Sequence, residues 1–428
     1  MKNLLLSMSL LAALVPAAHA QPGDYAPIIF VHGNGDDATK WIPVIWLFES
    51  NGYTADRLFA IRFTDPVARR EDNKPEAFRS STTDQASELS AFVTRVLLKT
   101  KARKVVLVGS SRGGMTIRNY LKNAGGSAVV SHAILCGTPN HGVMAMDTDL
   151  DGEFNGKGHY LRQLNEDSEL IDGVKFLTLR SDKLDKFAQP GVGYDGPELK
   201  GAENVVLPGL DHREVAFHPL AFAETYRFVT GGPPKHRKPL PEAAPILSGI
   251  LTSFAGIAPT NRPLAGVHLR VFALKPGFAD RDGDALLDTT TGEAGAWGPL
   301  RVQSDREYEF VLEKDGRLLS YFMTGLLRSS TLLNFRFLPA QAAGQMPTGP
   351  RLLIHRPQGY LSKGRDFVTV DGAAVEELLP GIPTRDSLAI PVPASKKASV
   401  RVELRGEVVH ARAAEAENEL NVVELVWD

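Results

Sequence analysis

The sequence predicts an α/β domain built on a parallel sheet, followed by a C-terminal region of antiparallel β-sandwich structure. In the first half, short apolar runs alternate with helical patterns, as in a parallel sheet whose strands are buried on both faces. In the second half, apolar residues recur at every second position between turn sequences, as in antiparallel strands. A proline-rich, basic segment at residues 231–241 separates the two patterns and predicts a linker.

The elements of the first half can be placed one by one. A helix between the second and third strands follows from the spacing of Leu89, Val93 and Val96, with Thr82 and Gln85 as its capping box. A second helix should begin after Gly113, and the last should run from Pro219 to the glycine pair at 231–232. The strands are expected at residues 28–31, 58–63, 105–108, 133–136, 176–179 and 205–207.

Length and composition set the domain count and exclude one class of partner. With 428 residues, two or three domains are expected. We divide the chain into a signal peptide (1–20), a catalytic domain (21–232), a linker (233–245), a β-sandwich module (246–345) and a second β module (346–428). Lys and Arg number 48 against 50 Asp and Glu, so no basic field is available to bind nucleic acid.

The first twenty residues have the pattern of a secretory signal peptide. Lys2 precedes an apolar run, and small residues surround a cleavage site after Ala20. No later run reaches the roughly 18 apolar residues of a transmembrane helix. We therefore expect a protein secreted to the medium or the periplasm, with an undetermined oligomeric state.

The segment around Ser111 carries the strongest chemical signal. Gly109, Ser111 and Gly113 form G-x-S-x-G directly after a buried strand and directly before a helix. In that context the motif is a nucleophile elbow, a strained turn that exposes the serine hydroxyl above the sheet. Ser111 is therefore the predicted nucleophile.

A serine nucleophile needs a histidine base and a carboxylate. In this type of chain the carboxylate follows the serine, and the histidine follows the carboxylate. His212 comes directly after the last strand and is the predicted base. Asp182 and Asp185 both follow the preceding strand, and Asp185 is favoured because it leads into Phe187. The other carboxylate would cap or brace the loop.

The oxyanion of the tetrahedral intermediate needs two preorganised N–H donors. Arg112, next to the nucleophile, should supply one backbone N–H, and Asn34 in the glycine-rich loop after the first strand should supply the other. The side chain of Arg112 is expected to pack or form an ion pair, with contact to an acidic substrate as the alternative. No cofactor or metal is required.

These motifs together resemble the small bacterial lipases of the α/β-hydrolase fold, over roughly residues 25–230. The resemblance rests on the His32 to Gly35 loop, the elbow, the Gly137 to Gly142 stretch and the Gly209 to His212 stretch. The β-rich tail is similar to that of archaeal-type lipases, and residues 247–338 look like a transthyretin-like module. Arg112 departs from the apolar residue or histidine usual after the nucleophile. The resemblance implies carboxylic ester hydrolysis more firmly than it implies a triglyceride substrate.

The leading hypothesis is a serine lipase or esterase acting through an acyl-enzyme on an ester or lipid, at a lipid or polymer interface. The alternatives are an aliphatic polyester depolymerase and a non-catalytic binding protein on a hydrolase scaffold. The insert at residues 140–173 is expected to cover the active site, and the tail to set substrate size. Asp147, Asp149 and Asp151 are spaced like a calcium loop, but Gly158 stands where a bidentate Glu belongs, so a solvated loop is favoured.

Overall fold

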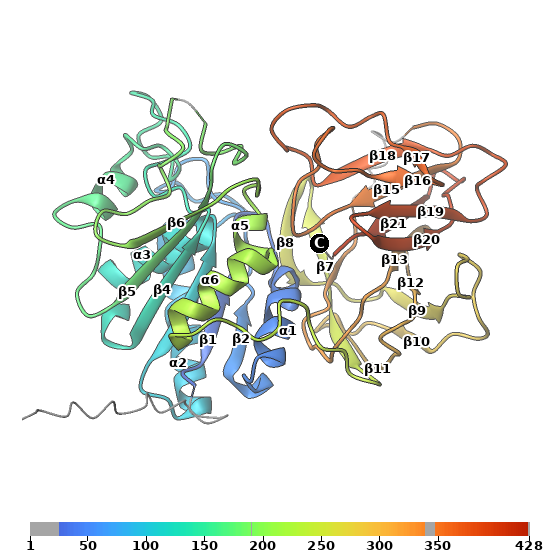
Figure 1. Ribbon diagram of the computed structural model, residues 1–428, viewed down its shortest axis with the longest axis horizontal. Coiled ribbons are helices and arrows are strands. Elements are labelled where there is room, and N and C mark those ends of the chain that lie inside the picture. The colour runs from blue at the N-terminus through green and yellow to red at the C-terminus, as the bar shows by residue number, and fades with distance from the viewer. Residues whose placement is uncertain (1–24, 190, 339–346, 427–428) are drawn as a thin grey trace, which may run out of the picture.

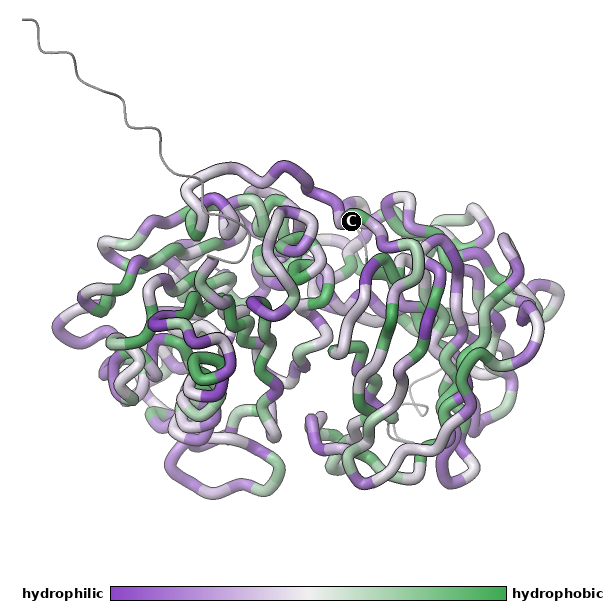
Figure 2. The backbone as a smooth tube through the Cα atoms, turned by 90° about the horizontal axis from the view of Figure 1, so that it is seen from below, coloured by the Kyte–Doolittle hydropathy of each residue, from purple (hydrophilic) through white to green (hydrophobic). Residues whose placement is uncertain are grey.

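A computed structural model describes residues 25–189, 191–338 and 347–426 of the chain. The expected signal peptide therefore lies outside the described residues. Two halves lie side by side: a helix-covered sheet from the first half of the chain, and a β-rich half (Figures 1 and 2). This is the predicted fold class.

The first half is a six-stranded parallel sheet in the order β2-β1-β3-β4-β5-β6. Its strands lie close to their predicted positions, because β1, β3, β4 and β5 are apolar runs buried between two helical layers, with β2 and β6 at the more exposed edges. The bounds are β1 Ile28–Val31, β2 Leu58–Ile61, β3 Val105–Ser110, β4 Val130–Cys136, β5 Lys175–Ser181 and β6 Glu203–Leu207.

Helices cover both faces of this sheet (Figure 1). Alternate residues of β1 show how: Ile28 and Phe30 face the cluster formed with α1, α5 and α6, while Ile29 and Val31 face α2 and α3. The helices are α1 Ile42–Ser50, α2 Thr82–Thr100, α3 Arg112–Asn123, α4 His159–Asn165, α5 Glu214–Phe217 and α6 Pro219–Thr230, with short 3₁₀ turns at Ala38–Trp41, Ala55–Arg57 and Gly126–Ala128.

One predicted helix cap is wrong by one residue. The capping box of α2 is formed by Ser81 and Asp84, not by Thr82 and Gln85. The Ser81 hydroxyl accepts the Asp84 N–H, and the Asp84 carboxylate accepts the Ser81 N–H. An ionised carboxylate at this position also interacts favourably with the helix dipole, which a glutamine side chain cannot do.

The second half forms a seven-stranded sheet, β10-β9-β12-β13-β21-β15-β18, and two four-stranded sheets, β11-β7-β14 with β8 beside β7, and β17-β16-β19-β20. Most pairings are antiparallel as expected, but β21 pairs in parallel with both β13 and β15, and β14 pairs in parallel with β7. Strand bounds are β7 Ile246–Ala255, β8 Ala258–Pro263, β9 His268–Ala273, β10 Leu287–Thr290, β11 Ala296–Arg301, β12 Tyr308–Lys314, β13 Arg317–Met323, β14 Phe335–Arg336, β15 Arg351–His355, β16 Thr369–Val370, β17 Ala373–Ala374, β18 Ser387–Pro391, β19 Val400–Leu404, β20 Glu407–Ala411 and β21 Glu419–Glu424.

Both faces of the seven-stranded sheet are covered. Tyr321 and Val422 pack toward the cluster of β7 and β11, while Phe322 and Val423 pack toward that of β19 and β20. Strands on either side of residues 339–346 share this sheet, which places the two expected β modules in one sandwich. The division of the chain into separate domains stays a prediction.

The two halves of the chain also share a core. Ile42 and Trp46 of α1 are buried in the cluster that contains Leu247, Leu251 and Phe310 of the β half. The Trp46 indole N–H donates to the Ser329 carbonyl oxygen at 3.0 Å. The β half is therefore packed against the helical half through buried apolar surface.

Candidate active site

Four loops that carry predicted site residues leave the same edge of the parallel sheet. They follow the carboxyl ends of β1, β3, β5 and β6, where ligands bind in open α/β sheets. Asn34, Ser111, Asp185 and His212 lie on these four loops.

Ser111 stands in the strained conformation expected of an elbow. Its φ is 54° and its ψ is −123°, a combination that L-residues rarely adopt. Its N–H donates to the Cys136 carbonyl oxygen at 2.8 Å, which ties the turn to β4. A Cβ at Gly113 would lie 2.4 Å from the Val31 carbonyl oxygen, so only glycine allows α3 to approach β1 so closely.

His212 and Asp185 are hydrogen-bonded at 2.8 Å between Nδ1 and Oδ2, and both side chains are buried. The Phe187 N–H donates to the other carboxylate oxygen of Asp185 at 2.8 Å, and the Phe187 ring meets the imidazole edge to face. The imidazole also packs on Gly137, where a Cβ would lie 3.3 Å from Nδ1. Gly137 follows Cys136, which accepts the Ser111 N–H, so the histidine lies beside the elbow.

Asp182, the other carboxylate considered for the acid, has different partners. Its Oδ1 accepts the N–H of Lys183 at 2.6 Å and that of Gly209 at 3.3 Å. Asp182 thus braces the loops, and Asp185 contacts the histidine.

The loop after β1 approaches the nucleophile closely. A Cβ at Gly33 would lie 3.2 Å from Ser111 Cβ. Within the loop, Asn34 Oδ1 accepts the Ala68 N–H at 2.8 Å, and His32 Nε2 accepts the Phe63 N–H at 3.2 Å. Burial lowers the pKa of His32, consistent with a neutral ring that accepts this bond. Arg112 begins α3, where backbone N–H groups have no partner within the helix.

The side chain of Arg112 is a buried ion-pair group. It donates to both oxygens of Glu153, at 2.5 Å from Nε and 2.6 Å from Nη2. Its remaining donors reach the carbonyl oxygens of Pro66 and Ser80 and the Ser80 hydroxyl. Glu153 belongs to the expected cover, so the residue next to the nucleophile fastens that insert. Glu153 was not predicted from the sequence. The only signal for this ion pair was the presence of a carboxylate in the insert, together with the expectation that Arg112 forms an ion pair.

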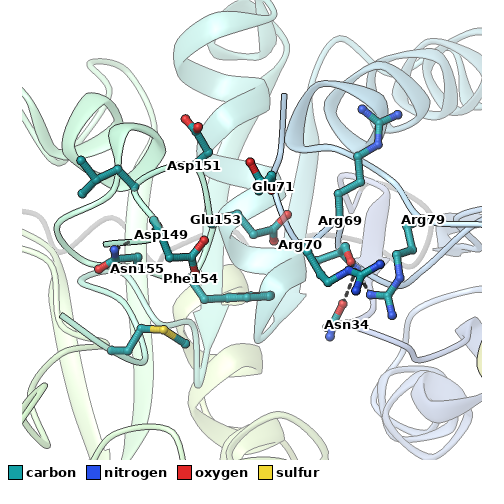
Figure 3. A pocket seen from close by; sticks show the side chains of 14 residues that line it. Asn34, Arg69, Arg70, Glu71, Arg79, Asp149, Asp151, Glu153, Phe154 and Asn155 are labelled. Carbon is teal, nitrogen blue, oxygen red and sulfur yellow. Dashed lines mark hydrogen bonds between the residues drawn. The ribbon is translucent and has the colours of Figure 1, made fainter. Parts of the chain in front are cut away.

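A cavity of about 730 Å³ lies between this insert and the segment after β2, with Asn34 of the loop after β1 at its wall. Figure 3 shows Asn34, Arg70 and Arg79 on one side of it, and Asp149, Phe154 and Asn155 on the other. Asn34 connects the cavity to the loop beside Ser111. The cover itself stays a prediction.

The aspartates spaced like a calcium loop, Asp147, Asp149 and Asp151, are exposed or partly exposed. Asp147 pairs with Lys157, and Asp151 pairs with His159. Among the described residues, no group of three or more His, Cys, Asp or Glu side chains is arranged to hold a metal ion. Within the same residues, no helix is long and apolar enough to cross a membrane.

Residues 25–183 match the family "Lipase (class 2)", and residues 246–339 match the "Lipase C-terminal domain". Together the two matches cover more than half of the chain. The chain is an α/β-hydrolase lipase with a C-terminal β domain.

Solved structures of lipases are similar to this chain at low sequence identity. Aspergillus fumigatus lipase B is 16% identical, covers 52% of this chain and 57% of its own, and has a TM-score of 0.39. This lipase thus spans a little over half of that protein. Bacillus licheniformis lipase BlEst2 in mature form is 21% identical over 50% of this chain and 96% of its own, with a TM-score of 0.38. Its propeptide form is 15% identical over 94% and 95%, also at 0.38.

Proposed function

We propose that this lipase is a secreted serine carboxylic-ester hydrolase that acts through an acyl-enzyme on Ser111. The observation that carries the proposal is the buried Asp185–His212 hydrogen bond of 2.8 Å beside a serine held at positive φ. A serine hydroxyl is a weak nucleophile until a positioned base takes its proton. Asp185, His212 and Ser111 supply the acid, base and nucleophile of that arrangement.

The reaction has two halves. Ser111 Oγ attacks the ester carbonyl carbon while His212 Nε2 takes the hydroxyl proton, and Asp185 stabilises the imidazolium that forms. The backbone N–H groups of Asn34 and Arg112 would donate to the oxyanion. His212 then gives its proton to the alcohol, which leaves. Water attacks the acyl-enzyme by the same route and releases the carboxylic acid.

The test is stoichiometric labelling with a fluorophosphonate, followed by peptide mapping and turnover of a short-chain p-nitrophenyl ester. We expect label on Ser111 and loss of at least about 10³-fold in kcat for Ser111→Ala, since the covalent step is removed. Ser110→Ala, one position away, is the matched control and should be labelled normally. If Ser111→Ala keeps more than a few per cent of the turnover, the proposal fails.

A further inference from the structure

The turn that carries His212 is bounded by two buried carboxylates. Asp211 Oδ1 accepts the Glu214 N–H at 3.0 Å, and Glu214 Oε2 accepts the Asp211 N–H at 2.7 Å. These reciprocal bonds close the turn that leads into α5, with His212 inside it. Both side chains have no exposed surface, so their charges need partners.

Those partners come from the C-terminal half of the chain. Glu214 Oε1 is 2.6 Å from Arg356 Nη2 and 3.0 Å from Arg405 Nη1. Arg365 reaches both carboxylates, at 2.8 Å from Glu214 Oε2 and 3.0 Å from Asp211 Oδ2. The histidine turn is thus held by guanidinium groups more than 140 residues away along the chain.

Asp366 completes this six-residue cluster of three arginines and three carboxylates. Its oxygens lie 2.9 Å from both Arg365 Nε and Arg405 Nη2. Burial opposes ionisation of Glu214, but the three arginines outweigh it and hold its pKa below the usual range. Glu214 is therefore charged, and its geometry is fixed by several charge-assisted bonds.

The C-terminal half also contacts the loops after β5 and β1, and contacts the loop after β6 at a second point. Lys186, next to Asp185, donates to the Thr384 carbonyl oxygen at 3.0 Å. Arg336 donates to the Gly35 and Asp36 carbonyl oxygens at 2.7 and 2.8 Å, in the loop after β1. Arg213, next to His212, pairs with Asp386 at 2.6 Å. Contacts from the β half therefore reach three of the four site loops.

We propose that the C-terminal β half positions the general base, and that the six-residue cluster is the device that holds the histidine turn. The inference rests on the proposed role of His212. Arg356, Arg365 and Arg405 are positioning residues, because they touch the turn and not the substrate. A displacement of about 1 Å in a reacting group can cost about 100-fold in rate, so a device that fixes this turn acts directly on turnover.

The experiment compares two arginines of the full-length protein. Arg405 and Arg412 flank β20, each has a side chain 28% exposed, and each pairs with a buried glutamate. Arg405 pairs with Glu214 of the histidine turn, whereas Arg412 pairs with Glu309 of the β half. Arg405→Gln and Arg412→Gln therefore perturb the β half similarly, and only the first touches the turn.

The readout is kcat per titrated serine with a short-chain p-nitrophenyl ester, with active serines counted by a phosphonate. Because only folded, active enzyme is titrated, unfolded protein does not lower the measured kcat per serine. We expect Arg405→Gln to lower kcat per serine about tenfold or more with KM within about twofold. Arg405→Lys should recover much of the loss, and Arg412→Gln should stay within about twofold of the wild type.

The outcomes separate this inference from the proposed function. If Arg405→Gln and Arg412→Gln give the same kcat per serine while Ser111→Ala is inactive, the positioning inference fails alone. If Ser111→Ala remains active, the proposed function fails and the inference with it. Should Arg405→Gln not fold, Asp366→Asn weakens the same cluster instead, at its contacts with Arg365 and Arg405. An unchanged kcat per serine in that variant overturns the inference.

Discussion

Asp185→Asn should remove most of the activity without unfolding the protein, and the reason lies in two hydrogen bonds. One oxygen of Asp185 accepts the Phe187 N–H and the other accepts His212 Nδ1–H, both at 2.8 Å. In the asparagine variant the oxygen keeps the Phe187 N–H, since an NH₂ group there would face another donor. The NH₂ group then faces Nδ1 of His212, which must accept. The ring proton moves to Nε2, the nitrogen that has to accept from the serine.

A histidine held in the wrong tautomer costs about 10⁴-fold in kcat, which is about 5 kcal/mol of transition-state stabilisation. The assay is kcat/KM on a short-chain p-nitrophenyl ester, with the melting temperature as a check on folding. Asp182→Asn is the matched control: its oxygen Oδ1 can still accept from Lys183 and Gly209, so the loss should stay below about threefold. Retention of a tenth of the activity by Asp185→Asn, or a larger loss in the control, would refute the reasoning.

Two further predictions concern stability. Glu153→Gln leaves the buried guanidinium next to the nucleophile without its carboxylate, so we expect a loss of about 3 kcal/mol in unfolding free energy, or roughly 3–4 °C in Tm for a chain of this length. Asp147→Asn, in an exposed pair of the same insert, should not change Tm measurably, and equal shifts would contradict the burial argument. A chain that ends at residue 234 should show no cooperative thermal transition by circular dichroism, because it exposes Ile42 and Trp46 and leaves Asp211 and Glu214 without their arginines. A truncated chain that folds and turns over short esters would refute both this prediction and the positioning inference.

The truncation prediction changes the expected role of the tail. If the tail only set substrate size, its removal would leave the core of the first half intact. The shared core at Ile42 and Trp46, and the arginines on the histidine turn, make the β half part of the site's framework. A role in substrate size can still be measured with intact chains, by comparing long and short esters in variants of the β half.

Local patterns in the sequence predicted the parallel sheet and the elbow because those features depend on neighbouring residues. Six apolar runs between helical patterns are enough to indicate buried strands, and G-x-S-x-G after a strand indicates the strained serine turn. The order of residues along the chain pointed to His212. It also reduced the acid to two carboxylates, three residues apart.

Only the tertiary structure decided which carboxylate meets the histidine and what holds the histidine turn. Asp182 and Asp185 lie on one short loop, and their contacts depend on how that loop folds against the segment after β6. The arginines of the six-residue cluster lie 142 to 191 residues from Glu214, and isolated arginines and acids in a sequence are typical of a solvated surface. Their burial follows from the packing of two halves of the chain, and charge pairing over such separations leaves no periodic signal in the sequence.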